Sequence, residues 1–410
     1  MKIYFCFPYK KIGGVSMVFL RLSMALAKKG YDCCLVDYID GCMALRKPDG
    51  VALLEYRDDE FVFIPNDGIV IFQSMTPWSI FPSLVIDPAT KVFFWNCHPF
   101  NLVPTLPGIR STMKSHPRFG KFIIKTILNS YRNKLIRLIN HLCSMDALIF
   151  MDRTNLKVTE QYLDFKLASP VLLSIPLLGR SLSLFKGYDV SSKKIRITWI
   201  GRIVDFKYFI LKRALIDLNA FAQNFPSFRL EITIIGQGDA LELLVSDVVR
   251  LDKVQVKFVD YIDSGRLPGF LAAETDMLMA MGSSALEGAR VGIPTLLLDL
   301  SYRDVGNGYR YQWLSDRDGY TLGDYIDDEH FIENNESLAA RLFELIHNSS
   351  RVSSRAKSYY DSHHSTESVV KKFASLVSKS NCIWGDLERL NLTGKDSLYS
   401  LFVWIRKKYR

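Results

Sequence analysis

Two cations follow a short run near the middle of the chain in which apolar residues alternate with Arg196 and Thr198. The run at 195–200 ends at Gly201-Arg202, and Lys207 comes five residues after the arginine. Such a run predicts a buried parallel strand, and open parallel sheets bind ligands at the carboxyl ends of their strands. The guanidinium of Arg202 is a planar donor and the ammonium of Lys207 is a point charge, so together they can hold a diphosphate. Because this spacing of arginine and lysine is common in sequences, the pair by itself is no more than a candidate anion site.

A second candidate anion site begins at Gly282, which is followed by Ser283 and Ser284 and then by a predicted helix. The free N–H groups at a helix N-terminus favour a phosphate. Glu287, one turn into this helix, could accept hydrogen bonds from a ribose. A structural alternative stays open, because Ser284-x-x-Glu287 is also a capping box.

Glycines follow two other predicted strands. Gly236 and Gly238 end a strand in the second half of the chain, and Gly13-Gly14 follow the first strand. We expect Ser16 to cap the helix after this pair, and the helix N-terminus to approach a phosphate or an acceptor. Glycine pairs are equally typical of simple turns.

One histidine lies where a ligand could be reached. His98 follows the apolar run 92–95, which places it at the ligand edge of the first predicted sheet. The other histidines show no metal-ligand spacing, and no G-x-S-x-G motif or cysteine and histidine pairing indicates a nucleophile. Seven cysteines without a C-x-x-C motif indicate neither a disulfide framework nor a zinc site, and they fit a reducing cytosol. The sequence therefore predicts no resident metal and no cofactor.

The elements that must position these residues alternate between strand and helix. Short apolar runs separated by helical patterns are typical of parallel sheets that are covered on both faces. A stretch at 174–194, rich in serine, glycine and proline, is typical of a linker and divides the 410 residues into two such patterns. We predict one doubly wound α/β domain over 1–185, a second over 190–370, and a C-terminal helical tail over 371–410.

A basic segment within the first domain, residues 110–142, combines charge with an apolar stripe. It contains eight Lys and Arg residues and no Asp or Glu. Apolar residues recur at helical spacing from Ile124 to Leu142, and cations beside such a stripe are typical of helices in a membrane interface. The alternative is that the stripe packs on the sheet and the cations form a solvated rim. The residues predicted to contact an anionic membrane are Lys114, Arg118, Lys121, Lys125 and Arg132.

The net charge of +9 does not by itself indicate a nucleic-acid-binding protein. Much of the excess lies in the basic segment and in a predicted terminal helix from residue 396 onward. The basic segment has few aromatic residues, and the chain shows no nucleic-acid-binding module. No run reaches the roughly 18 apolar residues of a membrane helix, and the N-terminus shows no signal peptide. We therefore expect a cytoplasmic protein that associates peripherally with the inner face of the cytoplasmic membrane.

The order and spacing of these motifs resemble the family 4 glycosyltransferases, which have the GT-B fold of two Rossmann-like domains facing each other across a cleft. The resemblance covers roughly residues 1–370. One departure is Met279, which stands where the family has the first glutamate of an E-x(7)-E pattern. The segments that carry the resemblance are the N-terminal glycine loop, the G-R-x(4)-K string at 201–207, the glycine turn at 236–238 and the L-E-G-x(3)-G-I-P string at 286–294.

The resemblance implies a retaining enzyme that takes a sugar from a nucleoside diphosphate sugar held by the C-terminal domain, without an essential metal. The sugar would be a hexosyl or an N-acetylhexosaminyl group. The resemblance assigns the leaving diphosphate to Arg202 and Lys207, the ribose to Glu287 and a donor-sugar contact to His98. Further donor-site residues that it implies are Gly201, Gly236, Gly238, Gly282, Ser283 and Ser284.

Many relatives with similarly loose motifs build bacterial surface polysaccharides, so we expect a lipid-linked glycan acceptor of O-antigen, lipopolysaccharide or capsule type. Two other functions fit the same fold. A nucleotide-sugar 2-epimerase would need acid and base carboxylates and histidines in its cleft. A non-catalytic subunit of a glycan or membrane assembly is suggested only by Met279. The presence of Arg202, Lys207 and Glu287 together favours the transferase.

Overall fold

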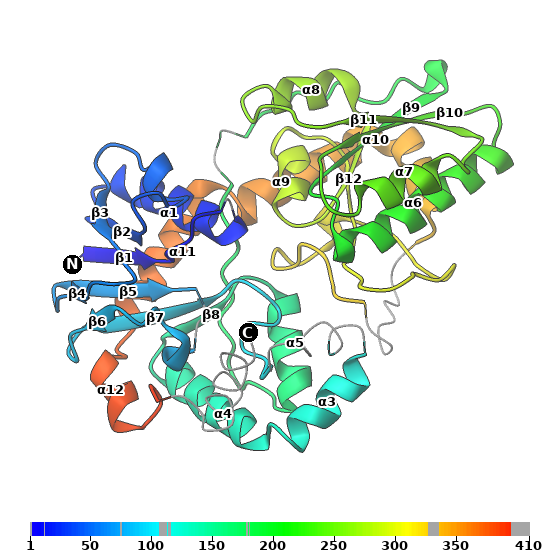
Figure 1. Cartoon of the computed structure of the whole chain (residues 1–410). Helices are drawn as coiled ribbons and strands as arrows, with labels where there is room; N and C mark the ends of the chain where they lie inside the picture. Colours follow the sequence, from blue (N-terminus) through cyan, green and yellow to red (C-terminus); the bar gives the residue numbers. More distant parts are fainter. Residues whose placement is uncertain are drawn as a thin grey trace. The chain divides into compact units, whose positions relative to one another are not determined.

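The structure, a computed structural model, describes residues 2–11, 13–73, 76–105, 113, 116–177, 179, 181–326 and 336–394. The chain divides into two compact units (Figure 1). Unit 1 combines Met1–Leu178 with Thr366–Arg410, and unit 2 is Gly179–Ser365. The chain therefore passes between the units twice, at 178–179 and at 365–366.

Unit 1 is built on a six-stranded sheet in the order β3-β2-β1-β5-β7-β8, in which every neighbouring pair is parallel. Most of its strands are short apolar runs, because a strand covered on both faces buries all of its side chains. The strands are β1 (Lys2–Cys6), β2 (Cys33–Asp37), β3 (Ala52–Glu55), β5 (Gly68–Phe72), β7 (Lys91–Asn96) and β8 (Leu148–Phe150). A separate two-stranded sheet consists of β4 (Val62–Ile64) and β6 (Leu84–Ile86).

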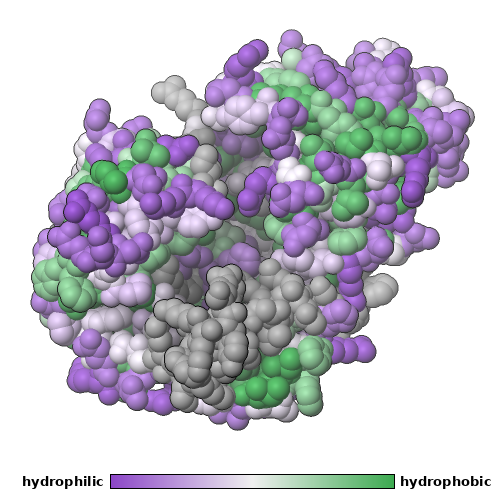
Figure 2. Space-filling model, in the orientation of Figure 1, coloured by the Kyte–Doolittle hydropathy of each residue, from purple (hydrophilic) through white to green (hydrophobic). Residues whose placement is uncertain are grey.

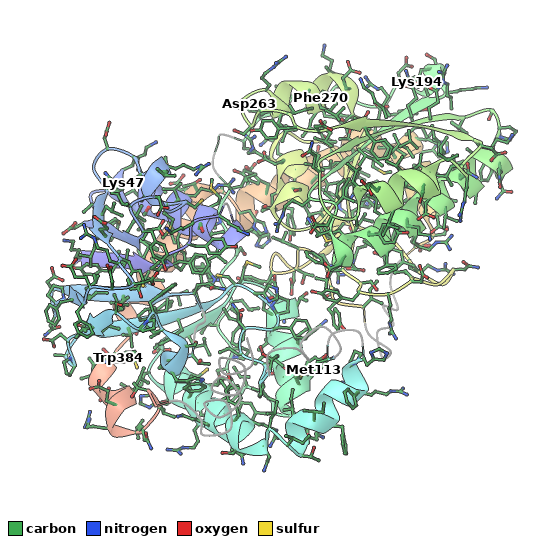
Figure 3. All side chains as sticks on the ribbon, viewed as in Figure 1. Lys47, Met113, Lys194, Asp263, Phe270 and Trp384 are labelled. Atoms are coloured by element: carbon green, nitrogen blue, oxygen red, sulfur yellow. The ribbon has the colours of Figure 1, made fainter. Side chains whose placement is uncertain are left out.

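Helices cover both faces of this sheet (Figure 1). On one face, Phe5 packs against Phe19 of α1 and Phe373 of α11, with ring centroids 5.3 and 5.9 Å apart. The other face packs against α4 and α12 through side chains such as Leu138 and Trp384, the latter labelled in Figure 3. The helices of unit 1 are α1 (Gly14–Ala27), α3 (Pro117–Lys125), α4 (Asn129–Ser144), α5 (Arg153–Leu163), α11 (Thr366–Lys379) and α12 (Trp384–Arg389).

The apolar stripe of the basic segment belongs to this core. The segment forms two helices, α3 and α4, and not one, because the chain turns at 126–128. Leu135 and Leu138 are fully buried, and the stripe as a whole, from Ile124 to Leu142, is buried. The stripe therefore packs inside unit 1 and is not available to a membrane, which corrects the expectation that it lies in the interface.

The chain after residue 365 packs on unit 1, where the sequence predicted a separate tail over 371–410. The apolar face of α11 covers the sheet through Phe373, and the amide of Trp384 donates to the carbonyl of Thr90 at 2.9 Å. This packing occurs because α11 carries an apolar stripe that must be buried. The predicted terminal helix from residue 396 lies outside the described residues.

Unit 2 is built on a second six-stranded sheet in the order β11-β10-β9-β12-β13-β14, which is parallel except for β14. The strands are β9 (Lys194–Ile200), β10 (Arg229–Ile235), β11 (Val254–Val259), β12 (Met277–Ala280), β13 (Thr295–Leu297) and β14 (Gln312–Trp313). The helices are α6 (Asp205–Asn224), α7 (Leu241–Val248), α8 (Leu267–Glu274), α9 (Ser283–Arg290) and α10 (Leu338–His363).

Each sheet has one place where the strand order reverses. In unit 1, β1 lies between β2 and β5, and in unit 2, β9 lies between β10 and β12. Open α/β sheets bind ligands at the carboxyl ends of the strands at such a switch point. The loops that leave β1 and β9 carry Gly13-Gly14 and Gly201-Arg202, so both predicted loops lie at switch points.

Candidate functional site

The centre of the candidate site is the loop and helix start at 201–207, which we call the cation loop. Gly201 follows β9, Arg202 is exposed, and Lys207 lies in the first turn of α6. A Cβ atom on Gly201 would lie 3.0 Å from Nζ of Lys207, so the ammonium group lies against this glycine. Within the described part of the chain, neither Arg202 nor Lys207 is paired with a carboxylate.

The electrostatics of the cation loop fit an anion. Burial and the nearby charge of Arg202 lower the pKa of Lys207 to about 8. By solvent exposure Lys207 is half-buried. A half-buried cation without a carboxylate partner costs folding free energy, so a bound anion explains this charge better than a role in stability does. Lys212 further along α6 differs, because it is paired with Asp247 at 3.3 Å. The arrangement can therefore bind a diphosphate, with Arg202 and Lys207 as its cations.

Backbone packing explains the two glycines of the 236–238 turn. A Cβ atom on Gly236 would lie 1.9 Å from the carbonyl oxygen of Gly201, and one on Gly238 would lie 2.2 Å from that of Ile203. The amide of Ile203 also donates to the carbonyl of Gln237 at 2.9 Å. The glycines therefore let the β10–α7 loop support the cation loop, a reason that the sequence did not reveal.

The second predicted anion site lies at the start of α9. Gly282 is the N-cap with φ of 63°, and its N–H donates to the carbonyl of Leu322 at 2.7 Å. That amide is therefore occupied. Ser283 is exposed and Ser284 half-buried in the first turn, where the amides have no acceptor within the helix. The amides and hydroxyls of these two serines are the groups that could bind an anion.

Glu287 has a partner within its own helix. Its Oε2 accepts a hydrogen bond from Nη2 of Arg290 at 2.8 Å. The helix begins at Ser283 without a side-chain cap, so the capping-box alternative for Glu287 is wrong. Arg290 is largely buried near Gly179, where the chain enters unit 2. Glu287 therefore holds Arg290 in place, and a ribose contact would be a second role.

Met279 lies within β12 and is 1% exposed in the hydrophobic core of unit 2. The connection from β12 to α9 consists of only Met281 and Gly282. The side chain at position 279 therefore packs in the hydrophobic core of unit 2. The methionine that stands in place of the family's first glutamate is therefore a core residue in this chain.

His98 lies in the loop after β7 of unit 1 and is half-buried. Its Nδ1 accepts the N–H of Phe100 at 3.1 Å, and its own amide donates to Oδ1 of Asn96 at 3.2 Å. In a neutral ring, this arrangement places the proton on Nε2. His98 thus shapes the turn after β7, and its contact with a donor sugar stays a prediction.

The glycine loop of unit 1 starts its helix earlier than the sequence predicted. The N-cap of α1 is Gly13, in an extended conformation with φ of −138° and ψ of 156°, and the helix begins at Gly14. Ser16 therefore lies inside the first turn, and the prediction that it caps the helix is wrong. An extended N-cap followed by Gly14 leaves this helix end without bulky side chains.

The predicted membrane cations have different surroundings. Lys125 is paired with Asp164 at 2.9 Å, and Nε of Arg132 donates at 2.6 Å to the last carbonyl of α5. Cations are favourable at a helix C-terminus, so these two residues stabilise the end of α5. Arg118 is exposed and Lys121 half-buried on α3.

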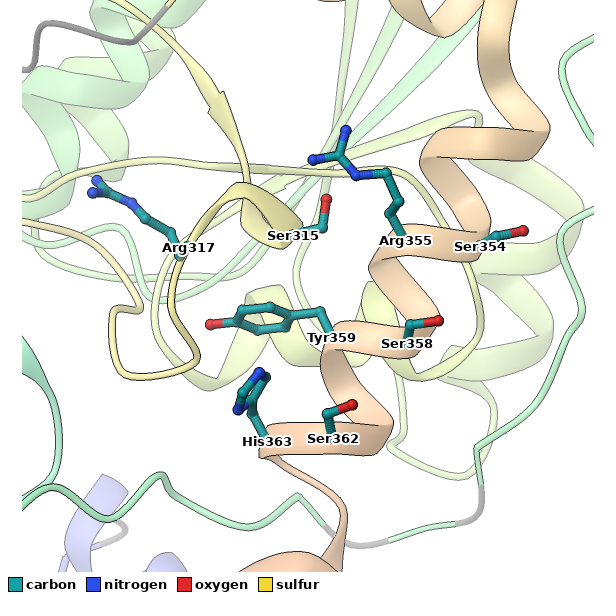
Figure 4. Close-up of a pocket in the computed structure, with 8 residues that line it drawn as sticks. All are labelled: Ser315, Arg317, Ser354, Arg355, Ser358, Tyr359, Ser362 and His363. Carbon is teal, nitrogen blue, oxygen red and sulfur yellow. The ribbon is translucent and has the colours of Figure 1, made fainter.

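A pocket of about 350 Å³ lies elsewhere in unit 2, between η4 (Leu314–Asp316) and the C-terminal half of α10 (Figure 4). It is lined by Ser315, Arg317, Ser354, Arg355, Ser358, Tyr359, Ser362 and His363, none of which the sequence predicted as a site residue. Arg317 is paired with Asp324 at 2.6 Å, and Arg355 with Asp316. The charges of this pocket are therefore balanced within the fold, unlike those of the cation loop.

Among the residues that the structure describes, little favours chemistry by a metal ion or by a thiol. There, no three His, Cys, Asp or Glu side chains gather in an arrangement that could hold a metal ion. Burial raises the pKa of the Cys33 thiol to about 12 and raises that of Cys97 as well. These thiols are therefore protonated at neutral pH and poor nucleophiles. Independence from a metal stays a prediction.

Comparison with solved structures shows similarity over nearly the whole chain. A glycosyltransferase from Rickettsia africae aligns with a TM-score of 0.52 at 12% identity, over 92% of this chain and 98% of that one. WaaG, a glycosyltransferase involved in lipopolysaccharide biosynthesis, gives 0.51 at 14% identity, over 92% and 99%. The pneumococcal O-GlcNAc transferase GtfA, solved with UDP and GlcNAc, gives 0.50 at 11% identity, over 93% and 99%.

These similarities establish the fold. The mixed α/β structure with parallel sheets has the GT-B fold, which confirms the fold predicted from the sequence. No family model and no curated protein matches the chain. Membership of family 4 stays a prediction.

Proposed function

We propose that this chain is a glycosyltransferase that moves a hexosyl or N-acetylhexosaminyl group from a nucleoside diphosphate sugar to a lipid-linked bacterial glycan. The observation that carries the proposal is the cation loop, in which Arg202 and Lys207 have no carboxylate partner within the described residues. This loop lies at the switch point of the second sheet, and α9 begins after the neighbouring strand. The similarity to WaaG supports a role in polysaccharide synthesis, and the similarity to GtfA supports a UDP-sugar donor.

In the proposed mechanism, the cation loop acts on the leaving group. Negative charge accumulates on the diphosphate as its bond to the sugar breaks, and Arg202 and Lys207 bind that charge more strongly than they bind the intact donor. The departing diphosphate oxygen takes the proton of the acceptor hydroxyl, which attacks on the same face, so the anomeric configuration is retained. The protein orients donor and acceptor and needs no separate general base.

Transfer is expected to proceed with retention and without a metal ion. The reaction of UDP-glucose or UDP-N-acetylglucosamine with octyl glycoside acceptors, in the presence of EDTA, should give a product with the anomeric configuration of the donor. NMR coupling constants of the anomeric proton measure the configuration, and Arg202→Ala is the low-activity control. An inverted product, or activity that EDTA abolishes and Mg²⁺ restores, would contradict the mechanism.

Replacing Glu287 by glutamine is expected to weaken UDP binding by about tenfold, because a carboxylate that accepts a ribose hydroxyl makes a charge-assisted bond. Calorimetry measures the affinity for UDP and for an analogue that lacks both ribose hydroxyls. The difference between the two affinities gives the contribution of those hydroxyls to binding. The wild type should prefer UDP, and Glu287→Gln should lose that preference. Arg290→Met breaks the same ion pair and is the matched control, which should keep the preference. A loss in both variants, or in neither, would exclude the ribose contact.

The proposed contact with a membrane rests on a surface formed by α3 and the turn after it. Phe119 and Phe122 are 49% and 62% exposed, and Ile127 is 59% exposed. Together with Arg118 and Lys121, they form what we call the α3 patch. Figure 2 shows an apolar area on the part of the surface where α3 lies in Figure 1. Exposed aromatic residues beside cations are typical of surfaces that bind an anionic membrane.

The α3 patch differs from the membrane contacts that the sequence predicted. Lys125 and Arg132 stabilise the end of α5, and Lys114 lies outside the described residues. Among the described residues, no helix is both long enough and apolar enough to span a bilayer. We propose that the protein docks peripherally through the α3 patch at the cytoplasmic face of the membrane, where a lipid-linked acceptor would present its reactive hydroxyl.

A further inference from the structure

An exposed aromatic side chain lies against the glycine loop of unit 1. Tyr9, in the loop between β1 and α1, is 39% exposed. A Cβ atom on Gly13 would lie 3.3 Å from Cε1 of Tyr9, so a side chain at position 13 would press on the ring. The ring of Phe7 lies beside that of Tyr9, with the two ring centroids 5.4 Å apart. Tyr9 is thus held beside the N-terminal end of α1.

Backbone hydrogen bonds fix the position of Tyr9. The carboxylate of Asp37, fully buried at the end of β2, accepts the N–H of Tyr9 and that of Met43, each at 2.8 Å. The carbonyl of Tyr9 accepts the N–H of Cys42, also at 2.8 Å. Both backbone groups of Tyr9 are therefore held before any ligand arrives. Binding of a ligand to the ring would therefore cost little free energy for ordering the loop.

The helix end beside Tyr9 contains a polar atom that the fold leaves unsatisfied. Ser16, in the first turn of the 14-residue helix α1, is 0% exposed. Its Oγ has no hydrogen-bond partner among the residues that the structure describes, and it lies 3.8 Å from the position of a Cβ on Gly13. A buried hydroxyl without a partner is costly. The first-turn amides of α1 lack acceptors within the helix, so a phosphate oxygen at this end could satisfy both groups.

We propose that Tyr9 stacks on the sugar ring of a glycosyl phosphate, whose phosphate group binds the N-terminus of α1 and the hydroxyl of Ser16. This inference rests on the proposed glycosyltransferase function, because a lipid-linked acceptor presents a sugar joined to a phosphate. The C–H groups of a sugar face pack well on an aromatic ring. Since the ring of Tyr9 lies 3.3 Å from where a Cβ on Gly13 would be, it lies next to the proposed phosphate position and would select the group attached to the phosphate.

The test compares two probes at the same helix end. The full-length protein is titrated with inorganic phosphate and with glucose 1-phosphate, and the NMR signals of the Gly13 and Gly14 amides report binding. Glucose 1-phosphate should bind the wild type about tenfold more tightly than phosphate does. Tyr9→Phe should keep this ratio because it keeps the ring, and Tyr9→Ala should lower it to about one. Equal affinities in the wild type, or an unchanged ratio in Tyr9→Ala, would overturn the proposal.

A variant of Ser16 tests the phosphate position. Ser16→Ala should weaken the binding of both probes by about fivefold and leave their ratio unchanged, because only the phosphate contact is removed. Unchanged affinity for both probes would show that the phosphate is not bound there. Calorimetry with UDP separates this inference from the proposed function. A wild type that does not bind UDP would contradict the donor site, whereas failure at Gly13 and Gly14 alone would contradict the role of Tyr9.

Discussion

Replacing Lys207 by methionine is expected to abolish most UDP binding and, at the same time, to stabilise the protein. Burial and the charge of Arg202 lower the pKa of Lys207 to about 8, so the fold disfavours the charged form. Methionine keeps the length of the side chain and removes the charge. UDP affinity should fall by about 100-fold, and the free energy of unfolding at neutral pH should rise by about 2 kcal/mol. Calorimetry and chemical denaturation measure these two effects.

Lys212→Met is the matched control, because this lysine lies on the same helix and is paired with Asp247 at 3.3 Å. It should lose a little stability and keep its UDP affinity. If Lys207→Met kept its UDP affinity, the donor diphosphate would bind elsewhere. If that variant were less stable than the wild type, the ammonium would have a stabilising partner in the fold.

The same lysine makes UDP binding depend on pH. As the pH rises through about 8, the free protein loses the charge on Lys207, so UDP affinity should fall by about tenfold over two pH units. Stability changes in the opposite direction. The folded-state pKa of about 8 is below the ordinary value of 10.5, so the unfolded chain binds more protons between these values and the free energy of unfolding rises across that window. Both pH dependences should be absent in Lys207→Met.

Replacing Phe119 and Phe122 together by serine is expected to release the protein from anionic vesicles. Two phenylalanine rings inserted into an interface bury enough apolar surface for the partition coefficient to fall by about 100-fold when they are removed. Co-sedimentation with phosphatidylglycerol-containing vesicles and with pure phosphatidylcholine vesicles measures the effect. Wild-type binding should also weaken in salt, because the Debye length shrinks from about 10 Å at 0.1 M to about 3 Å at 1 M.

Unit 1 offers a matched control for these phenylalanines. Phe61 and Phe63 are 80% and 54% exposed, but Asp59 and Glu60 precede them in the chain. Replacing both by serine should leave vesicle binding unchanged, because an acidic surface does not approach an anionic membrane. Equal losses in the two double variants would argue against the α3 patch. Equal wild-type binding to neutral and anionic vesicles would argue against it as well.

Sequence reasoning located the strands well and the start of one important helix poorly. It predicted a strand at 195–200, and β9 is Lys194–Ile200, because apolar residues that alternate with Arg196 and Thr198 are a local signal of a strand. Helical spacing of apolar residues is clear only from Leu211 onward, whereas α6 begins at Asp205. The first turns of α6 mix aromatic and charged residues, so apolar residues do not recur there at a clear helical spacing. The position of Lys207 in the first turn of the helix is therefore a finding of the structure.

The basic segment shows a second limit of the sequence. Its apolar stripe would look the same whether it packed on a sheet or lay in a membrane, because both environments remove the same side chains from water. The structure buries this stripe and leaves Phe119 and Phe122 exposed, two residues that the stripe did not include. Ser16 is a similar case, since no local signal indicates that its hydroxyl is buried without a partner.

The sequence by itself determined which loops could bind a ligand, because glycines and cations at the ends of apolar runs are local features of the chain. Only the tertiary structure decided which cations remain available to that ligand. Asp164 pairs with Lys125 and Asp247 pairs with Lys212, whereas Lys207 has no carboxylate partner within the described residues. Each of these carboxylates lies more than 30 residues from its lysine. Whether a buried charge is paired therefore depends on how distant segments pack, which the order of residues alone does not reveal.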